Sequence, residues 1–221
     1  MVSILDIIGP IMVGPSSSHT AGACRIALLA RAIAGGTPAR AKIELHGSFA
    51  KTAEGHGTDR ALVGGLLGFL PDDGRLRDSL DFAQREGLAF EFATVKLRGA
   101  HHPNTARLTL ERDGQSVSIT GSSLGGGRII ITEIDEMAVE VTGEYHTLVV
   151  VAADVPGTVA GITSILTRLH VNVATMRVSR HHKGGEAIHI YELDEAVPLA
   201  GQAELRELPA VRRVRLLGRV N

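Results

Sequence analysis

The chain has 221 residues, which is enough for one large domain or two modest ones. Hydrophobic residues make up 44% of it and the net charge is −1 at pH 7, so it has a globular composition without the basic surplus of most nucleic-acid binders. No apolar run reaches the roughly 18–20 residues of a membrane span, and the first ten residues lack the basic segment of a secretory signal. The single cysteine, Cys24, cannot form an internal disulfide, which is typical of a cytoplasmic protein. Together with the charge and the absence of a long apolar run, it predicts a cytoplasmic protein with no membrane or nucleic-acid partner.

The first part of the chain alternates the patterns of helices and strands. A serine-rich N-cap precedes a predicted helix at residues 19–34, which Gly35-Gly36 ends. A strand is predicted at 41–49, because apolar and charged residues alternate there. The remaining predicted elements are helices at 58–69 and 78–86, strands at 89–97, 106–112, 116–120 and 128–140, and a tight loop at 121–127.

The pattern restarts after Thr142-Gly143-Glu144. The predicted order is a strand at 147–153, a helix at 156–169, strands at 171–179 and 186–193, a helix at 202–208 and a strand at 211–217. This βαββαβ order is typical of the ferredoxin-like fold. We therefore expect an α+β protein, with a mixed α/β domain at residues 1–143 and a ferredoxin-like domain at 144–221.

Four polar segments of the first domain fall at junctions between predicted elements. They are residues 14–20, 47–59, 101–105 and 121–127. Loops at the ends of helices and strands are where a rigid scaffold usually carries its binding groups. The four segments are therefore the candidates for a binding site.

Three serines and a threonine precede the first predicted helix. One serine is expected to cap the helix, which is the simplest role for such a residue. A helix N-terminus also presents free N–H groups and a partial positive charge, and hydroxyl groups add further donors. Ser16, Ser17, Ser18 and Thr20 together therefore predict a site for a carboxylate or a phosphate.

Two histidines are candidate general bases, because imidazole titrates near neutral pH. His56 lies between two glycines, which let the backbone approach a ligand, although a structural role on a loop is the alternative. Asp59 could orient the His56 ring or cap the next helix. His19 directly follows the three serines.

The remaining polar residues do not predict a metal site. His101 and His102 are adjacent, and adjacent residues on a strand point to opposite faces. Asn104 and Thr105 are better interpreted as hydrogen-bonding groups. Cys24 is expected to be a small core residue.

These motifs, taken together, resemble those of the beta subunit of bacterial iron–sulfur L-serine dehydratases. The resemblance covers essentially the whole chain, with the motifs in the same order. It rests on residues 14–20 (GPSSSHT), 45–52 (LHGSFAKT), 55–59 (GHGTD), 102–105 (HPNT) and 123–127 (SLGGG).

The resemblance implies a lyase that converts L-serine to pyruvate and ammonia with a [4Fe–4S] cluster and without pyridoxal phosphate. One cysteine cannot hold such a cluster, so we expect its ligands to be cysteines of a separate alpha subunit, and no metal ligand in this chain. The implied catalytic residues are His56 and His19. The implied substrate-binding residues are Ser16, Ser17, Ser18, Thr20, Ser48, Thr58, Asp59, Asn104, Thr105, Gly125 and Gly126.

The second domain resembles an ACT domain, whose first turn commonly reads Asp-x-Pro-Gly. Asp154, Pro156 and Gly157 match that turn and are the implied regulatory residues. ACT domains commonly pair side by side, so we expect a homodimer formed through this domain. The first domain also resembles the substrate-binding regulatory domain of some D-3-phosphoglycerate dehydrogenases.

Two other functions remain open at this stage. The chain could be a serine-sensing regulatory module without catalytic activity, since both domains have relatives that bind amino acids for regulation. The two histidines favour catalysis, because capture of a carboxylate alone needs no base. A phosphate-binding enzyme is a weaker alternative, because the serine run lacks the spacing of a P-loop.

Overall fold

The structure is a computed structural model that describes residues 10–99 and 102–220. The chain divides into two compact units, Met1–Glu136 and Met137–Asn221. The domain boundary predicted between residues 143 and 144 lies further along the chain than this division and stays a prediction. No helix among the described residues is long and apolar enough to span a membrane.

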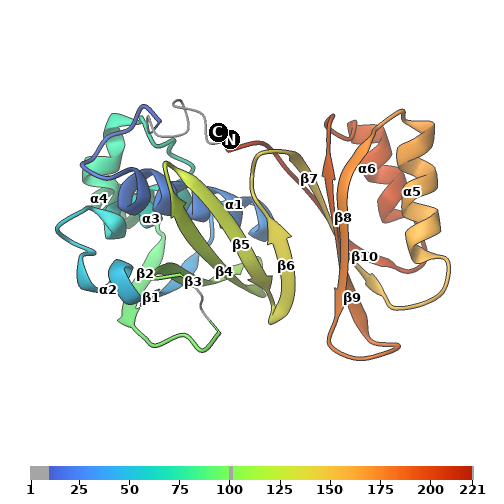
Figure 1. Ribbon diagram of the computed structural model, residues 1–221, viewed down its shortest axis with the longest axis horizontal. Helices are drawn as coiled ribbons and strands as arrows, with labels where there is room; N and C mark the ends of the chain where they lie inside the picture. The colour runs from blue at the N-terminus through green and yellow to red at the C-terminus, as the bar shows by residue number, and fades with distance from the viewer. Residues whose placement is uncertain (1–9, 100–101, 221) are drawn as a thin grey trace. The chain divides into compact units, whose positions relative to one another are not determined.

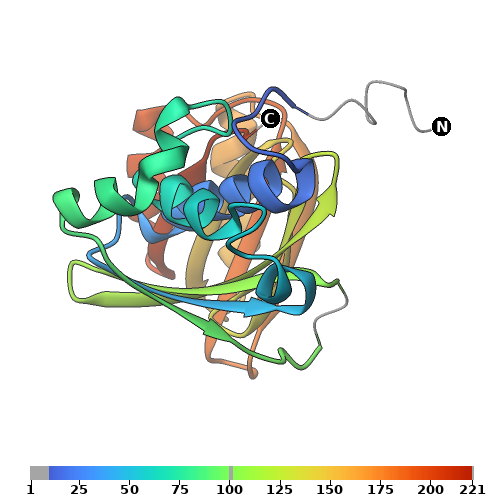
Figure 2. The ribbon, with the colours of Figure 1, turned by 90° about the vertical axis from the view of Figure 1, so that its left-hand side faces the viewer.

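The first unit is a single sheet with helices packed on one face (Figures 1 and 2). Its helical elements are η2 (Ser17–Gly22), α1 (Ala23–Ala34), α2 (Gly47–Lys51), α3 (Thr58–Leu67), η3 (Gly74–Asp78) and α4 (Ser79–Glu86). Its strands are β1 (Arg40–His46), β2 (Ala89–Thr94), β3 (Asn104–Arg112), β4 (Gln115–Gly125) and β5 (Arg128–Ile134).

The strands of this unit follow the order β2-β1-β3-β4-β5. β1 pairs parallel with β2 and antiparallel with β3, and the later strands form antiparallel hairpins. The predicted alternation in β1 is confirmed, since Ile43 and Leu45 are buried while Lys42 is exposed. The core lies between the sheet and the helices, and its largest fully buried side chains include Ile26, Leu29, Phe49, Leu62, Leu66, Leu108, Ile119 and Ile131.

Helices α1 and α3 cross closely enough to require a glycine. A Cβ atom at Gly65 would lie 2.4 Å from the carbonyl oxygen of Cys24 and 2.7 Å from the Cβ atom of Ala27. Glycine inside a helix costs about 1 kcal/mol relative to alanine, so this close packing offsets a real penalty. The crossing fixes the two helices that follow the serine-rich segment and the His56 segment.

The prediction that Cys24 is a core residue is confirmed. Its side chain is fully buried, and its Sγ atom donates a hydrogen bond to the carbonyl oxygen of Phe69. Burial raises the pKa of the Cys24 thiol to about 12. The side chain is therefore a neutral thiol that packs between helices.

Three predicted boundaries in this unit are wrong. The strand predicted at 41–49 ends at His46, because Gly47 adopts a φ of 60° and α2 begins there. The loop predicted at 121–127 is mostly strand, since β4 continues to Gly125. The strand predicted at 128–140 is interrupted by a turn in which Asp135 and Glu136 both have positive φ.

The second unit begins with β6 (Met137–Val141), and the predicted βαββαβ order follows it. The elements of that order are β7 (His146–Ala153), α5 (Thr158–Arg168), β8 (Val173–Arg180), β9 (Glu186–Leu193), α6 (Leu199–Arg206) and β10 (Val211–Leu217). The last four strands form an antiparallel sheet in the order β10-β7-β9-β8, with α5 and α6 on one face (Figure 1). This arrangement confirms the ferredoxin-like prediction.

The core of this unit lies between that sheet and its two helices. It is built mainly from Leu148, Val150, Ile162, Leu166, Tyr191, Leu193 and Leu205. Ile190 on β9 is only 2% exposed, whereas Val159 on α5 is 36% exposed. Met176 on β8 lies at the surface, with 51% of its side chain exposed.

Candidate active site

The serine-rich segment caps the first helical run of the chain. Ser16 is the N-cap, and its Oγ atom accepts a hydrogen bond from the backbone N–H of His19 at 3.1 Å. The capping role predicted for one serine is therefore confirmed. Ser17 and Ser18 are half-buried and make no side-chain hydrogen bond within the described part of the chain, so their hydroxyl groups are available to a ligand.

His19 is held between two serine hydroxyl groups. Its Nε2 atom lies 3.0 Å from Ser48 Oγ, and its Nδ1 atom lies 3.4 Å from Ser16 Oγ. The edge of its ring also contacts Phe49, with ring centroids 5.4 Å apart. Burial, and to a smaller extent the neighbouring His56, lower the pKa of His19, so its imidazole is neutral at pH 7.

The structure brings the two predicted histidines together. The ring centroids of His19 and His56 are 4.9 Å apart, in an edge-on arrangement. Thr20 ties the two segments to each other, because its Oγ1 atom donates a hydrogen bond to the backbone carbonyl of His56 at 3.0 Å. Residues 37 positions apart in sequence thus form one contiguous polar cluster.

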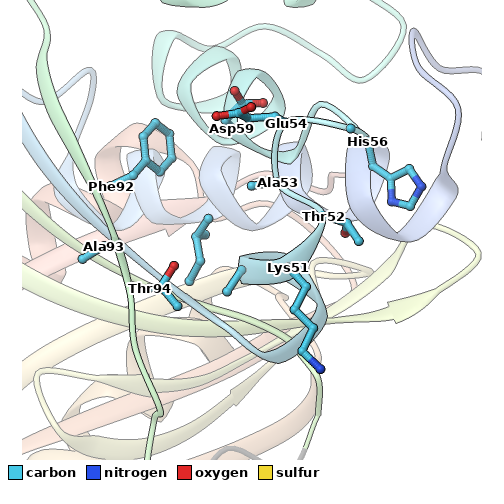
Figure 3. Close-up of a pocket in the computed structure, with 12 residues that line it drawn as sticks. Lys51, Thr52, Ala53, Glu54, His56, Asp59, Phe92, Ala93 and Thr94 are labelled. Carbon is cyan, nitrogen blue, oxygen red and sulfur yellow. The ribbon is translucent and has the colours of Figure 1, made fainter.

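His56 lines a cavity of about 620 Å³ (Figure 3). One wall is the segment from Lys51 to His56 together with Asp59, and another is formed by Phe92, Ala93 and Thr94 of β2. In Figure 3, Asp59 and Glu54 lie at one end of the cavity and Lys51 at the other. The cavity therefore offers charges of both signs.

Neither of the two expected roles of Asp59, orienting the His56 ring or capping α3, is observed. No hydrogen bond joins Asp59 to His56, and the N-cap of α3 is Gly57, which has a φ of 68°. The Oδ1 atom of Asp59 is instead buried without a partner, as are His56 Nδ1 and Thr58 Oγ1. Buried polar atoms normally have a hydrogen-bond partner, so these atoms are candidates for contacts with water or with a ligand.

The segments around Asn104 and Ser123 add further polar groups. Thr105 Oγ1 donates to the carbonyl of His102 at 2.6 Å and lies 2.7 Å from Ser122 Oγ, so it is fully engaged. Asn104 Oδ1 is buried without a hydrogen-bond partner. An isolated antiparallel bridge pairs Asn104 with Gly47, the residue before Ser48. Asn104 therefore lies close to the backbone that carries Ser48.

Ser123, which the predicted set of site residues does not include, lies against the segment that carries His19. Its side chain is fully buried, its Oγ atom has no partner, and a Cβ atom at Gly22 would lie only 2.1 Å from it. Gly22 belongs to η2, so Ser123 packs directly against the helical turn that carries His19. The serine before the glycine run was the available sequence signal.

The predicted glycines Gly125 and Gly126 have a structural explanation. Both have positive φ, at 94° and 62°, and they turn the chain from β4 toward β5. Arg25 Nη1 donates to the carbonyl of the next residue, Gly127, at 2.7 Å. No described hydrogen bond joins Gly125 or Gly126 to the histidine pair, so their part in substrate binding stays a prediction.

The predicted regulatory turn lies in the second unit. Gly157 is the N-cap of α5 with a φ of 93°, and Pro156 precedes it. The carboxylate of Asp154 accepts hydrogen bonds from Arg180 Nη1 and from the backbone N–H of Gly184, and these bonds lower the pKa of Asp154. The turn is thereby fixed to the hairpin between β8 and β9.

The donor set of this chain does not fit an iron–sulfur cluster. A cluster requires several thiolates, whereas the chain has one cysteine, and that thiol is buried and bonded to a carbonyl group. Among residues 10–99 and 102–220, no group of three or more His, Cys, Asp or Glu side chains is arranged to hold a metal ion. His101, one of the two adjacent histidines that were not expected to form a metal pair, lies outside the described residues.

Comparison with known proteins identifies the family. The family model "Serine dehydratase beta chain" matches residues 3–79, and the model "ACT domain" matches residues 146–210. The chain is 41% identical to the "Probable L-serine dehydratase, beta chain" of Bacillus subtilis (strain 168) over 212 residues, which cover 96% of each chain. The chain belongs to the family of L-serine dehydratase beta chains.

The chain is also similar to two further proteins. The "L-serine dehydratase, beta chain" of Peptoniphilus asaccharolyticus is 42% identical over 180 residues, or 81% of each chain. The "D-3-phosphoglycerate dehydrogenase" of Synechocystis sp. is 34% identical over 95 residues, which are 43% of this chain and 17% of that protein. The resemblance drawn from the motifs is thus confirmed for both units of this beta chain.

Proposed function

We propose that this beta chain forms, with a separate alpha chain, an enzyme that converts L-serine to pyruvate and ammonia in the cytoplasm. The observation that carries the proposal is the contact between His19 and His56, at 4.9 Å, surrounded by buried polar atoms without partners. A base and unsatisfied hydrogen-bonding groups beside one cavity are what removal of an α-proton from a small polar substrate requires.

His56 is the proposed base. Its Nδ1 atom is buried, which leaves Nε2 as the nitrogen that can meet the α-hydrogen of serine. His19 is a weaker candidate, because both of its ring nitrogens already face serine hydroxyl groups. Its role is to orient Ser48 and the serine-rich segment.

The carboxylate of the substrate is proposed to bind at the start of the first helical run. Ser17 and Ser18 offer free hydroxyl groups there, and the helix N-terminus adds a partial positive charge. Ser16 and Thr20 have structural duties in the same segment, as the N-cap and as the link to His56. The four predicted residues therefore divide into two that bind and two that position.

The [4Fe–4S] cluster is proposed to be ligated by cysteines of the alpha subunit. This follows from the donor set of the beta chain, whose only thiol is buried in a helix interface. The alternative of a regulatory module without activity is not favoured, since the relatives that match most of the chain are named as parts of dehydratases. The test is to mix the two purified chains and to measure pyruvate formation from L-serine.

The second unit is proposed to hold two beta chains together. Its sheet ends at β8, and Met176 and Val178 on that strand are 51% and 41% exposed. An open strand edge with exposed apolar side chains is a pairing surface unless another chain covers it. We therefore expect a homodimer whose contact includes β8.

Replacing Met176 and Val178 by glutamate should convert the dimer into a monomer, because four carboxylates would be brought together at the contact. Light scattering of the full chain at micromolar concentration measures the change. Leu199→Glu is the matched control, since Leu199 is 83% exposed in the same unit and lies on α6. A double variant that stays dimeric, or a chain without residues 144–221 that stays dimeric, would place the contact elsewhere.

A further inference from the structure

A second cavity, of about 220 Å³, adjoins the other side of the His56 segment. It shares Glu54, Gly55 and His56 with the larger cavity. Its remaining walls are Val13, Gly14, Pro15, Thr20, Gly57, Arg60, Ala61, Leu76 and Arg77. The cavity thus lies between the serine-rich segment, the start of α3 and η3.

Two arginines give this cavity a positive surplus. Arg60 lies on α3 and Arg77 on η3, and neither guanidinium forms an ion pair or a hydrogen bond within the described residues. The only acidic residue in the lining is Glu54. Both arginines are solvent-exposed residues that line the cavity. Arginine side chains without an internal partner are a usual recognition group for an anion.

A neighbouring arginine shows the contrast. Arg75 lies on the same short helix as Arg77, but its guanidinium bonds to both carboxylate oxygens of Asp73 and stacks on the ring of Phe69. Its charge is therefore neutralised, and it does not line the cavity. The helix carries one arginine that is used internally and one that is left free.

We infer that this second cavity is a binding site for a small anion, with Arg60 and Arg77 as its charged contacts. A volume of about 220 Å³ has room for a carboxylate of three carbons or for an inorganic oxyanion. Both have the same recognition chemistry, a compact negative charge that accepts hydrogen bonds from a guanidinium fork. Neither arginine belongs to the predicted set of site residues.

Occupation of the cavity affects the proposed reaction. Gly14 and Thr20 line the cavity and also belong to the serine-rich segment. A bound anion there repels a second negative charge at the adjacent carboxylate site. Resting on the proposed function, we expect the anion to inhibit the dehydratase by raising the KM for L-serine.

Isothermal titration of the full chain alone with pyruvate, and separately with inorganic phosphate, tests the site without any need for activity. We expect at least one of them to bind, and the double variant Arg60→Gln/Arg77→Gln to weaken that binding at least tenfold. Tighter binding of pyruvate would identify a carboxylate site, and tighter binding of phosphate an oxyanion site. Arg75→Gln is the matched control and should bind as the unaltered chain does.

The inference is overturned if neither anion binds at millimolar concentration, or if the double variant binds as well as the unaltered chain. It is also overturned if Arg75→Gln loses as much affinity as the double variant, since the loss would then reflect damage to η3. Melting temperatures of the three chains show that each is folded. An inactive mixture of alpha and beta chains would refute the proposed function and leave the titration result standing.

Discussion

Replacing His56 by glutamine in the assembled enzyme is expected to lower kcat about 10²–10⁴-fold while changing KM little. The loss is that of a missing general base, which acts in the transition state and contributes little to substrate binding. Glutamine keeps a polar side chain of similar size, so the contact with the His19 ring is largely preserved. Steady-state formation of pyruvate over a range of serine concentrations separates the two constants.

The matched control is His19→Gln. Because His19 orients Ser16 and Ser48, its loss should raise KM more than it lowers kcat. If His56→Gln kept near-normal turnover while His19→Gln lost it, the base would be His19 instead. Such a result would reverse the roles of the two histidines without changing the site.

Replacing Ser18 by alanine is expected to weaken substrate binding by roughly 1–3 kcal/mol, the usual cost of losing a hydrogen bond to a charged partner. This corresponds to a rise of about 5–150-fold in the KM for L-serine. The physical grounds are a free hydroxyl group at a helix N-terminus that offers further donors. The measurement is the KM of the assembled enzyme.

Two controls separate carboxylate binding from helix capping. The amide of L-serine lacks the carboxylate, so its KM should be nearly the same for Ser18→Ala and for the unaltered enzyme. Ser16→Ala removes the N-cap and should lower the free energy of unfolding by about 1 kcal/mol. Equal losses for serine and its amide would mean that Ser18 supports the helix and does not hold the carboxylate.

Local patterns predicted most helices and strands, because apolar periodicity reflects burial directly. The alternation of buried Ile43 and Leu45 with exposed Lys42 predicted β1, and the order of the elements predicted the ferredoxin-like unit. The errors lie at element boundaries, which depend on backbone angles that the apolar pattern does not reveal. Gly47 turns β1 into α2, and a glycine-rich segment expected to be a loop runs as strand as far as Gly125.

The sequence motifs predicted which residues belong to the candidate site but not which of them contact one another. Sequence motifs named His19, His56 and Ser48, yet only the fold places a serine hydroxyl on each ring nitrogen of His19. Asp59 was expected to orient His56 because the two lie three positions apart, but no hydrogen bond joins them and Asp59 Oδ1 is buried without a partner. Such pairings depend on tertiary packing, which spacing along the chain does not encode.

The free arginines of the second cavity show the same limit. Arg60 and Arg77 lie 17 positions apart, on different helices, and no motif joins them. Whether an arginine is free depends on its neighbours, as Arg75 beside Asp73 illustrates. Only the folded chain distinguishes a guanidinium that is already paired from one that is available.

The central claim is that this beta chain supplies the base and the carboxylate site, and that the cluster belongs to another polypeptide. Anaerobic reconstitution with iron and sulfide tests it most directly, for the beta chain alone and for its mixture with a cysteine-bearing alpha chain. We expect no cluster absorbance and no pyruvate from the beta chain alone, and both from the mixture. A stoichiometric [4Fe–4S] signal and turnover of L-serine by the beta chain alone would contradict the account.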